Sequence, residues 1–400
     1  MVYDVIIIGA GASGLFAASN IKTDRGLILE KTHRPGTKLL MSGSGQCNIT
    51  HGGDIRDYIT HYGEHGKKIR SCLYKHNNLE LVEFLHSHGV ETVTREDGKV
   101  FPESMKAADV LNLLLRLAES NGFDILRDTQ VTGISQTGAE SDSDGCLKVT
   151  TPRGTFTAMK LIIATGGCSY PTTGSDGSFF RILHNDLGLE ITSLQPSLSP
   201  VNVYDYPYGE LSGISFPRAS VTHWRDGSKI SQNQGNALLL THRNFSGPLI
   251  INHSRYMKTG DIIRFNYIYP SDFREVLECI TAAMDGNRSG IAGVTASLFN
   301  LPKNFAKAVC MRAGNKARAI AALLTEDEYV VKSVEGFKTA MATAGGISLS
   351  EVNPKTMELK KHPNIFAIGE CLDVDGDTGG YNLQFAYSSA RAAADAVLQG

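Results

Sequence analysis

Apolar runs and helical spacing alternate at the start of the chain. Val2–Ile8 is a β-branched apolar run of the kind found in buried parallel strands, and Gly26–Glu30 predicts a second strand. Ser13–Ile21, which separates them, has the spacing of a helix. The three segments together predict a βαβ unit of about thirty residues. Two amphipathic helices are predicted further on, at Lys67–His88 and Ala107–Asn121.

The pattern then alternates and turns as in β structure before it returns to a helix. Asp124–Ser135 predicts one strand region, and Cys146–Thr150 with Thr155–Ala158 predicts a hairpin. Leu161–Ile163 is again of the buried-strand type. Asp176–Leu187 predicts a helix, which completes an α/β arrangement.

The character of the chain changes near Leu194–Pro200, where the glycine-rich signatures stop. Val201–Tyr269 is rich in β pattern, whereas Asp272–Asp285 and Lys303–Leu324 have helical spacing. The earlier pattern resumes near Gly336. The middle of the chain is therefore predicted to be a separate, inserted domain.

The C-terminal part completes the first domain. Ile365–Ile368 predicts a buried strand and Tyr381–Leu398 an alanine-rich helix. We expect an α/β protein with a three-layer, Rossmann-like domain built on a parallel sheet, formed by residues 1–193 and 336–400. A β-rich plus helical insert at residues 194–335 is expected to act as the substrate or cap domain.

Composition excludes several classes of protein. Hydrophobic residues are 42% and charged residues 20% of the 400, which predicts an ordered globular chain. Lys and Arg (39) balance Asp and Glu (41), so no nucleic-acid partner is expected and a small-molecule substrate is favoured. No apolar stretch reaches the ~18 residues of a membrane helix, so no membrane partner is expected. Seven cysteines without a CxxC spacing suit a cytoplasmic protein, and the oligomeric state stays open.

The run GAGASG follows the first predicted strand and opens the first predicted helix, as a GxGxxG dinucleotide motif does. Gly9 allows a tight turn, Gly11 lets the backbone approach a pyrophosphate, and Gly14 lets the helix pack close to the strand. Backbone N–H groups and the helix dipole then face two phosphates. Glu30, 21 positions after Gly9, is placed to accept hydrogen bonds from the adenosine ribose.

The C-terminal stretch favours FAD over NAD. TGGYNL opens the last predicted helix directly after a predicted strand and loop. In FAD enzymes of this architecture, the N-terminus of that helix points at the flavin pyrimidine ring, and Gly379 and Gly380 would permit the close approach. The helix dipole would stabilise negative charge on the reduced flavin by ~1–2 kcal/mol. That contact tunes the potential, because ~1.4 kcal/mol is about 30 mV for two electrons.

The motifs follow one another in a specific order. GAGASG, the strand-end Glu30, Lys38 with SGSGQCNIT, and ATGG are followed by TH with SGP, by TAGGI, and by GECLDVDG and GGYNLQ. This order resembles the BaiN/aminoacetone-oxidase-like (YhiN-type) flavoproteins over essentially the whole chain. The resemblance implies FAD, a fold like that of flavoproteins with two dinucleotide-binding domains, and reductase or oxidase chemistry on small organic molecules.

Two departures from the family pattern concern the substrate more than FAD. The family usually has arginine before the cysteine that Cys47 matches, whereas this chain has Gln46 and lacks that positive charge. The family also usually has a glycine between its Thr-His pair and its Ser-Gly-Pro. Here the linking run is Arg243, Asn244 and Phe245.

The residues expected to contact FAD come from these blocks and their flanks. They are Gly9, Ala10, Gly11, Ala12, Ser13, Gly14, Glu30, Lys31, Lys38, Ser42, Gly43, Gly45, Gln46, Cys47, Asn48, Val131, Thr165, Gly166, Gly167, Gly369, Glu370, Asp375, Gly380, Tyr381, Asn382 and Leu383.

His242 and Tyr381 are the candidates for polar work near the flavin. A histidine can donate or accept a proton near neutral pH, although a loop histidine with a structural role is the plainer interpretation. Tyr381 is expected to pack near the ring rather than transfer protons. Cys47 has no thiol partner at the CxxxxC spacing, where Ser42 and Gly52 stand, so a dithiol reductase is disfavoured.

The sequence contains little evidence for a cofactor other than FAD. No second GxGxxG follows a strand, so NADH or NADPH is expected only as a transient electron donor. The run HYGEH at residues 61–65 matches an inverted zinc motif, but Gly63 and Gly66 favour a turn over the helix that this motif needs. No metal site is expected.

The sequence thus predicts an FAD-dependent oxidoreductase for a small organic substrate. The favoured version is NAD(P)H-linked reduction of an activated C=C bond of the enone type. The alternatives are an amine or amino-ketone oxidase that uses O2, and a flavin-binding factor without catalysis. In each enzyme version the protein orients the substrate, tunes the flavin and excludes water.

Overall fold

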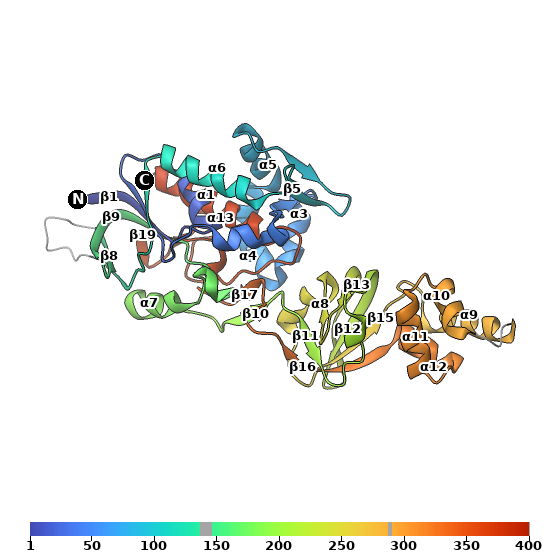
Figure 1. Ribbon diagram of the computed structural model, residues 1–400. Helices are drawn as coiled ribbons and strands as arrows, with labels where there is room; N and C mark the ends of the chain where they lie inside the picture. The colour runs from blue at the N-terminus through green and yellow to red at the C-terminus, as the bar shows by residue number, and fades with distance from the viewer. Residues whose placement is uncertain (137–145, 287–289, 400) are drawn as a thin grey trace. The chain divides into compact units, whose positions relative to one another are not determined.

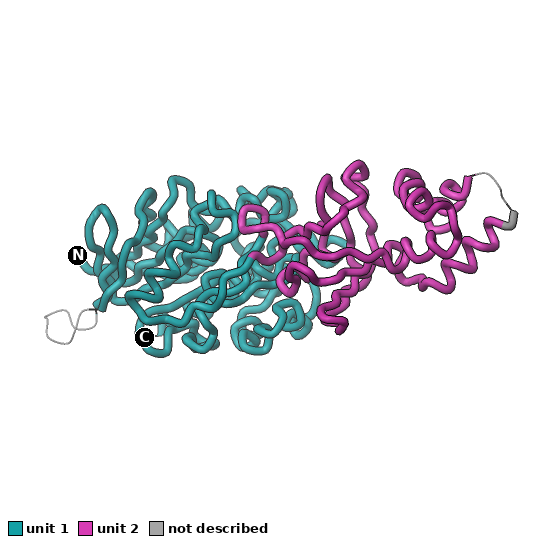
Figure 2. Tube along the Cα trace, turned by 90° about the horizontal axis from the view of Figure 1, so that it is seen from below, with its two compact units in different colours: residues 1–195, 341–400 teal, residues 196–340 magenta. Residues whose placement is uncertain are grey.

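The computed structural model describes residues 1–136, 146–286 and 290–399. The chain forms two compact units, Met1–Gln195 with Met341–Gly400, and Pro196–Ala340 (Figure 2). The second unit is therefore inserted into the first. The chain leaves the first unit through β10 (Gln195–Ser197) and re-enters it just before β17 (Ala342–Ala344).

A parallel sheet forms the centre of the first unit (Figure 1). Its five parallel strands are, in spatial order, β19 (His362–Ala367), β9 (Gly154–Ile163), β1 (Val2–Ile8), β2 (Gly26–Leu29) and β6 (Phe123–Leu126). A short strand, β18 (Glu358–Leu359), pairs antiparallel with β19. The inner strands are apolar where they are buried, at Val5–Ile8, Leu27–Leu29 and Leu161–Ile163. The α/β class and the Rossmann-like domain predicted from the sequence are confirmed.

Three helices pack together on one face of this sheet: α1 (Ala12–Ala18), α6 (Ala107–Ser120) and α13 (Tyr381–Gln399) (Figure 1). The alanines of α13 that face α1 are buried, and their small side chains let the two helices approach closely. This contact brings the first and last helices of the chain together. The N-terminal glycine loop and the C-terminal helix therefore belong to one site.

The strand predictions of residues 124–163 need two corrections. Asp124–Ser135 is not one strand region, because it divides into β6 and a separate strand, β7 (Gly133–Gln136). Leu161–Ile163 is not separate from the hairpin, because β9 continues through it after pairing with β8 (Leu147–Thr151). β7, β8 and the first half of β9 form an antiparallel meander, against which α7 (Ser178–Leu187) packs.

The segment between β2 and β6 carries short helices and a small sheet. The helix predicted at Lys67–His88 is two helices, because the Asn77 side chain accepts the Glu80 N–H at 3.0 Å and caps a new one. The elements are α2 (Thr37–Met41), α3 (Ile55–Tyr58), α4 (Gly66–Lys75), α5 (Asn78–Ser87), β3 (Thr50–His51), β4 (Thr92–Thr94) and β5 (Lys99–Pro102). The three strands pair in the order β3-β5-β4.

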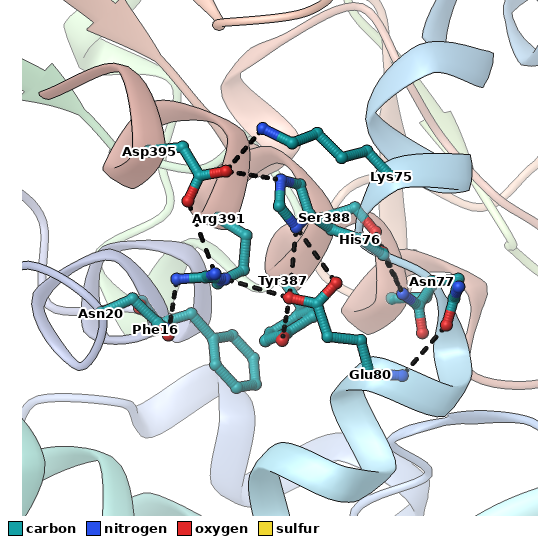
Figure 3. A network of polar contacts seen from close by, with 11 residues as sticks. Phe16, Asn20, Lys75, His76, Asn77, Glu80, Tyr387, Ser388, Arg391 and Asp395 are labelled. Atoms are coloured by element: carbon teal, nitrogen blue, oxygen red, sulfur yellow. Dashed lines mark hydrogen bonds and ion pairs between the residues drawn. The ribbon is translucent and has the colours of Figure 1, made fainter. Parts of the chain in front are cut away.

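A partly buried polar network ties α4 and α5 to α13 (Figure 3). Glu80 accepts hydrogen bonds from His76 and from Arg391 at 3.1 Å. Asp395 pairs with Lys75 at 2.5 Å and lies 3.4 Å from both Arg391 and the His76 ring. Burial opposes the ionisation of Glu80, but these hydrogen bonds outweigh it, so the pKa of Glu80 lies below its ordinary value. The network secures the helix that ends the chain.

The second unit contains a closed antiparallel barrel. Its strands are, in spatial order, β11 (Val201–Val203), β14 (Phe245–Ser246), β13 (Ser228–Leu240), β12 (Ser215–Arg225), β15 (Ile262–Asn266) and β16 (Asp327–Val334). A short helix, α8 (Pro248–Ile251), packs on β13. Phe245, Phe265 and Tyr267 lie in the barrel core, where their rings contact one another or their aromatic neighbours.

In the described part of the chain between β15 and β16, four helices gather beside the barrel (Figure 1). They are α9 (Phe273–Gly286), α10 (Ile291–Leu298), α11 (Lys303–Arg312) and α12 (Ala317–Thr325). The helix predicted at Lys303–Leu324 is thus interrupted between α11 and α12, and α10 has no counterpart in the prediction. None of the described helices is long and apolar enough to cross a membrane.

A buried carboxylate holds α11 to the barrel. Asp327 accepts hydrogen bonds from the hydroxyls of Tyr208, Tyr267 and Tyr329 at 2.6, 2.9 and 2.5 Å. Arg312, at the end of α11, pairs with the same carboxylate at 3.1 Å. A buried charge needs such partners, so the cluster is a structural link between helix and barrel.

Candidate functional site

The loop between β1 and α1 has one glycine that the protein itself does not need. A Cβ on Gly9 would lie 2.5 Å from the Ala164 carbonyl oxygen, and one on Gly14 would lie 2.0 Å from the Gly9 carbonyl oxygen. These two glycines are required by the fold. A Cβ on Gly11 would meet no heavy atom within 4 Å. The space beside Gly11 is therefore open, which suits the close approach of a pyrophosphate.

Glu30 lies at the same edge of the sheet, directly after β2. Its carboxylate accepts the Ala10 N–H at 2.8 Å and two hydrogen bonds from Thr32 at 2.7 Å each. The side chain is buried, with 8% of the residue exposed. A carboxylate offers about four acceptor positions, so one remains for a ribose hydroxyl.

Glu370 joins four segments of the first unit beside this loop. Its Oε1 accepts the Thr343 N–H at 2.9 Å and the Ser169 hydroxyl at 2.8 Å, while Oε2 accepts the Lys38 ammonium at 2.5 Å. Lys38 and Glu370 were predicted as site residues, whereas Ser169 was not. The feature of the sequence that could have indicated Ser169 is its position two residues after Gly167, the last glycine of the ATGG turn.

The predicted cofactor loop at residues 42–48 is unusual in its backbone. Gly43, Gly45 and Cys47 all have positive φ, and Cys47 is fully buried. Burial raises the pKa of the Cys47 thiol to about 11, so it is protonated and inaccessible rather than nucleophilic. The Asn48 amide donates to the Val100 and Thr50 carbonyls and accepts the Gly380 N–H at 3.1 Å. Asn48 thus connects this loop to the start of α13.

Arg95 brings a positive charge to Gln46, the position at which the resembled family usually has an arginine. The Arg95 guanidinium donates to the Gln46 side chain at 2.7 Å and lies 3.9 Å above the centre of the Phe101 ring. Arg95 is far from Gln46 in the sequence, so only the fold brings its charge to this loop. The loss of an arginine at position 46 does not leave the loop without a positive charge.

The start of α13 is built around Tyr381. Its ring stacks with two imidazoles, with the His61 centroid at 4.1 Å and the His51 centroid at 5.6 Å, each inclined by 15°. His61 is held by Asp377, whose carboxylate is 3.1 Å from Nδ1. The Tyr62 hydroxyl donates to the Tyr381 carbonyl at 2.8 Å. Sequence reasoning considered His61 only as part of a metal motif and missed this stack.

Two features limit what Tyr381 can do. Burial raises its pKa well above the ordinary tyrosine range, so the hydroxyl keeps its proton at neutral pH. Only 5% of the residue is exposed, which favours an orienting role over direct proton transfer. Gly380 is required here for packing as well, since its Cβ would lie 2.5 Å from the Thr50 carbonyl.

His242 lies in the second unit, just after β13, and is exposed. No described residue forms a hydrogen bond or ion pair with its ring. The neighbouring loop is held instead by Thr241, whose hydroxyl bonds Asn244. Tyr381 belongs to the first unit, so the two catalytic candidates come from different units.

The remaining predicted residues have identifiable places in the first unit. Lys31 pairs with Asp176 at 2.6 Å, and Asn382 exchanges two hydrogen bonds with Gly376 at 2.8 and 2.9 Å. A Cβ on Gly369 would lie 2.6 Å from the Ser13 hydroxyl, so the first and last glycine turns pack together. Val131 and Asp375 are buried. The other residues that were predicted to contact FAD, all in the first unit, are Ala10, Ala12, Ser42, Thr165, Gly166 and Leu383.

The run HYGEH does not form the helix that a zinc motif requires. It lies in a 3-10 segment that breaks at Tyr62 and Gly63, where the backbone is not helical. Among the described residues, no three His, Cys, Asp or Glu side chains are grouped so that they could hold a metal ion.

The glycine loop, the acidic residue after β2 and the C-terminal helix thus meet at one edge of a parallel sheet. Residues 3–396 match the family described as HI0933-like protein Rossmann domain. The chain belongs to this family. The HI0933-like family is one of FAD-dependent oxidoreductases.

Three relatives extend over nearly the whole chain. The ribosomal RNA dihydrouridine synthase of Escherichia coli (strain K12) is 28% identical, over 99% of this chain and 98% of its own length. The protein of the same name from Haemophilus influenzae is 27% identical over 97% of each chain. The 3-dehydro-bile acid delta(4,6)-reductase of Clostridium scindens is 27% identical over 97% of this chain and 98% of its own.

Solved structures share the fold. A flavocytochrome c3 fumarate reductase in its open conformation has a TM-score of 0.53 at 14% identity, covering 100% of this chain and 78% of its own. The 3-ketosteroid delta1-dehydrogenase from Sterolibacterium denitrificans has a TM-score of 0.51 at 12% identity, covering 100% and 99%. At these identities the likeness concerns the fold alone.

Proposed function

We propose that this protein uses FAD to reduce a carbon–carbon double bond conjugated to a carbonyl group, with NADH or NADPH as the electron donor. The observation that carries the proposal is the common chemistry of the full-length relatives. Dihydrouridine forms by saturation of the uracil double bond that is conjugated to a carbonyl. The name of the bile-acid reductase describes reduction of double bonds in a 3-oxo steroid. The two substrates differ, but the type of bond is the same.

The reaction requires a hydride and a proton on neighbouring carbons. A bound flavin, once reduced by the hydride of NAD(P)H, would be the source of the hydride for the carbon β to the carbonyl. The α carbon takes a proton from the medium or from a protein group. The residues near the start of α13 would orient the substrate and exclude water, since Tyr381 is buried and keeps its proton.

The first unit has what FAD would need. The open side of Gly11 would accept the pyrophosphate, and the spare acceptor position of Glu30 would take a ribose hydroxyl. Lys38 and Glu370 would line the same edge from opposite ends of the chain. Cys47 would pack without reacting, because its thiol is buried and protonated.

Two substrates fit the proposed reaction, and we favour the uracil base of an RNA. Two of the three full-length relatives are named for ribosomal RNA, and they share 97–99% coverage with this chain. A small enone is the second candidate, supported by the bile-acid reductase. An amino-ketone oxidase has no counterpart among these relatives.

Anaerobic spectroscopy followed by substrate assays tests the proposal. Purified yellow protein should lose its flavin absorbance when titrated with NADH or NADPH. The reduced protein should regain it on addition of in vitro transcribed ribosomal RNA or of a 3-oxo-Δ4 steroid, with one saturated bond formed per flavin. Bleaching by neither nicotinamide, or hydrogen peroxide formed from aminoacetone and O2, would overturn the reductase proposal.

A further inference from the structure

The near-neutral charge of the whole chain conceals an uneven distribution. The second unit, residues 196–340, has 16 Lys and Arg against 12 Asp and Glu, a formal charge of +4. The first unit has 23 against 29, a formal charge of −6. The sum combines a basic unit with an acidic one, so the near-neutral charge of the whole chain does not argue against a polyanionic partner.

The net positive charge of the second unit comes from one run of its chain. Residues 290–325 contain five Lys and Arg and no Asp or Glu. All five are exposed, and four of them pair with no described carboxylate: Lys303, Lys307, Lys316 and Arg318. We call these four residues, on α11, the turn after it and the start of α12, the basic helical surface.

The basic helical surface is held in place by the packing beneath it. The apolar face of α11 is buried through Phe305, Ala306 and Val309, so Lys303 and Lys307, one turn apart, point away from the core. The fifth cation, Arg312, is used internally by Asp327 and anchors the end of α11 to the barrel. Three of the four unpaired charges therefore lie on helices, and Lys316 is the N-cap of α12.

We propose that the basic helical surface docks the phosphate backbone of the RNA whose uracil is reduced; this inference rests on the RNA form of the proposed function. The charge of this surface is opposite to that of RNA, and none of its four cations pairs with a described carboxylate. Along the chain, the next acidic residues lie on α9 and at Glu326. Phosphate contacts of this kind supply affinity and position without reading sequence.

An anionic membrane is the weaker partner for this surface. A helix that lies in a membrane interface exposes a broad apolar face beside its cations. The apolar face of α11 is turned into the core instead. The large exposed apolar side chains of α10 to α12 are only Leu298 and Met311, at 47% and 69%.

The experiment measures RNA retention by the FAD-loaded full chain, using in vitro transcribed ribosomal RNA at 50–200 mM salt. Four phosphate contacts predict that affinity falls by about 50–150-fold over that fourfold rise in salt. A quadruple variant, with Lys303, Lys307, Lys316 and Arg318 each replaced by Gln, should bind roughly 10-fold or more weakly at the lowest salt. Its salt dependence should be shallower by about one power of salt concentration for each cation removed.

A matched variant controls for net charge. Lys67, Lys68, Arg70 and Lys106 are exposed cations of the first unit, and their replacement by Gln removes the same four charges. This control should bind RNA within about threefold of the unaltered protein. Both variants should keep the FAD stoichiometry and the NAD(P)H-dependent bleaching of the unaltered protein, because neither set belongs to the flavin site.

The outcomes separate docking from catalysis. Loss of RNA retention in the first variant alone, with bleaching intact, supports the basic helical surface. Equal retention by both variants, or no retention by the unaltered protein, overturns it, while reduction of a 3-oxo-Δ4 steroid would still uphold the proposed reaction. Binding to phosphatidylglycerol vesicles in preference to RNA would assign the surface to a membrane and also overturn the proposal.

Discussion

Replacement of Gly11 by alanine separates the needs of the cofactor from those of the fold. Gly11 has φ −80° and ψ −171°, an extended conformation that alanine adopts without strain. The added methyl group would meet no heavy atom of the protein within 4 Å. We therefore expect the free energy of unfolding of the apoprotein to change by no more than about 0.5 kcal/mol.

Gly11→Ala should instead weaken the binding of FAD. The methyl group would occupy the side from which we expect the pyrophosphate to approach the backbone. Hydrogen bonds to a charged group contribute about 1.5–3 kcal/mol each, so losing two would cost about 3–6 kcal/mol. This corresponds to a Kd for FAD roughly 10²–10⁴-fold higher, enough to give a colourless protein after gel filtration.

Gly14→Ala is the contrasting variant for this measurement. Its Cβ would lie 2.0 Å from the Gly9 carbonyl oxygen, so we expect loss of folding rather than selective loss of FAD. The assay combines FAD-to-protein absorbance ratios, a fluorescence titration for Kd, and thermal unfolding of each apoprotein. Comparison as apoproteins is essential, because bound FAD raises the Tm by mass action. A Gly11→Ala protein that binds FAD within threefold of the original Kd would refute the reasoning.

Three further predictions concern residues around the same site. Glu30→Ala should weaken FAD by about tenfold or more in a binding titration without altering the flavin absorption spectrum, because the ribose is remote from the ring; a large spectral change would place Glu30 elsewhere. Arg95→Gln removes the positive charge beside Gln46, so it should lower the flavin midpoint potential by about 10–30 mV in a dye-equilibration measurement. Adding Gln46→Arg should restore the potential. An unchanged potential in Arg95→Gln would show that Arg95 does not act on the flavin. The Glu80 pKa is lowered in the folded state, so its stabilising contribution is present above its ordinary value of 4.5 and is lost as pH falls through the folded pKa. Glu80→Gln should therefore reduce the free energy of unfolding by about 1–3 kcal/mol at pH 7 and flatten its decline below pH 4.5 in urea titrations; an unchanged slope would contradict the network.

The local patterns of the sequence were sufficient for the parallel sheet. Buried parallel strands are apolar on both faces, so Val2–Ile8 and Ile365–Ile368 stand out from their surroundings. The same patterns were insufficient for boundaries. Lys67–His88 looks like one helix by spacing, because the Asn77 cap that divides it is a local hydrogen bond without effect on apolar periodicity.

In the candidate site, the sequence predicted what lies within one local unit but not the contacts between distant segments. Spacing along the chain placed Gly11 and Glu30 correctly relative to each other, because one βαβ unit determines both. The stack of Tyr381 on His51 and His61 joins segments more than 300 residues apart, and no local pattern carries that information. The pairing of Arg95 with Gln46 was hidden for the same reason. The basic helical surface, by contrast, was readable in the sequence, once charge is counted by unit instead of by chain.

The glycines of the site show how such motifs should be interpreted. From the sequence, each glycine near a cofactor can be attributed to the ligand. In the structure a Cβ would strike the protein backbone at Gly9, Gly14 and Gly380, and a Thr343 side chain at Gly167. These residues are needed even by the empty protein, and their replacement would report on folding. Gly11 alone among these five has neither a close neighbour nor a positive φ. Its lack of a side chain has no use within the chain, which makes Gly11 the residue of this set whose identity argues most directly for a bound dinucleotide.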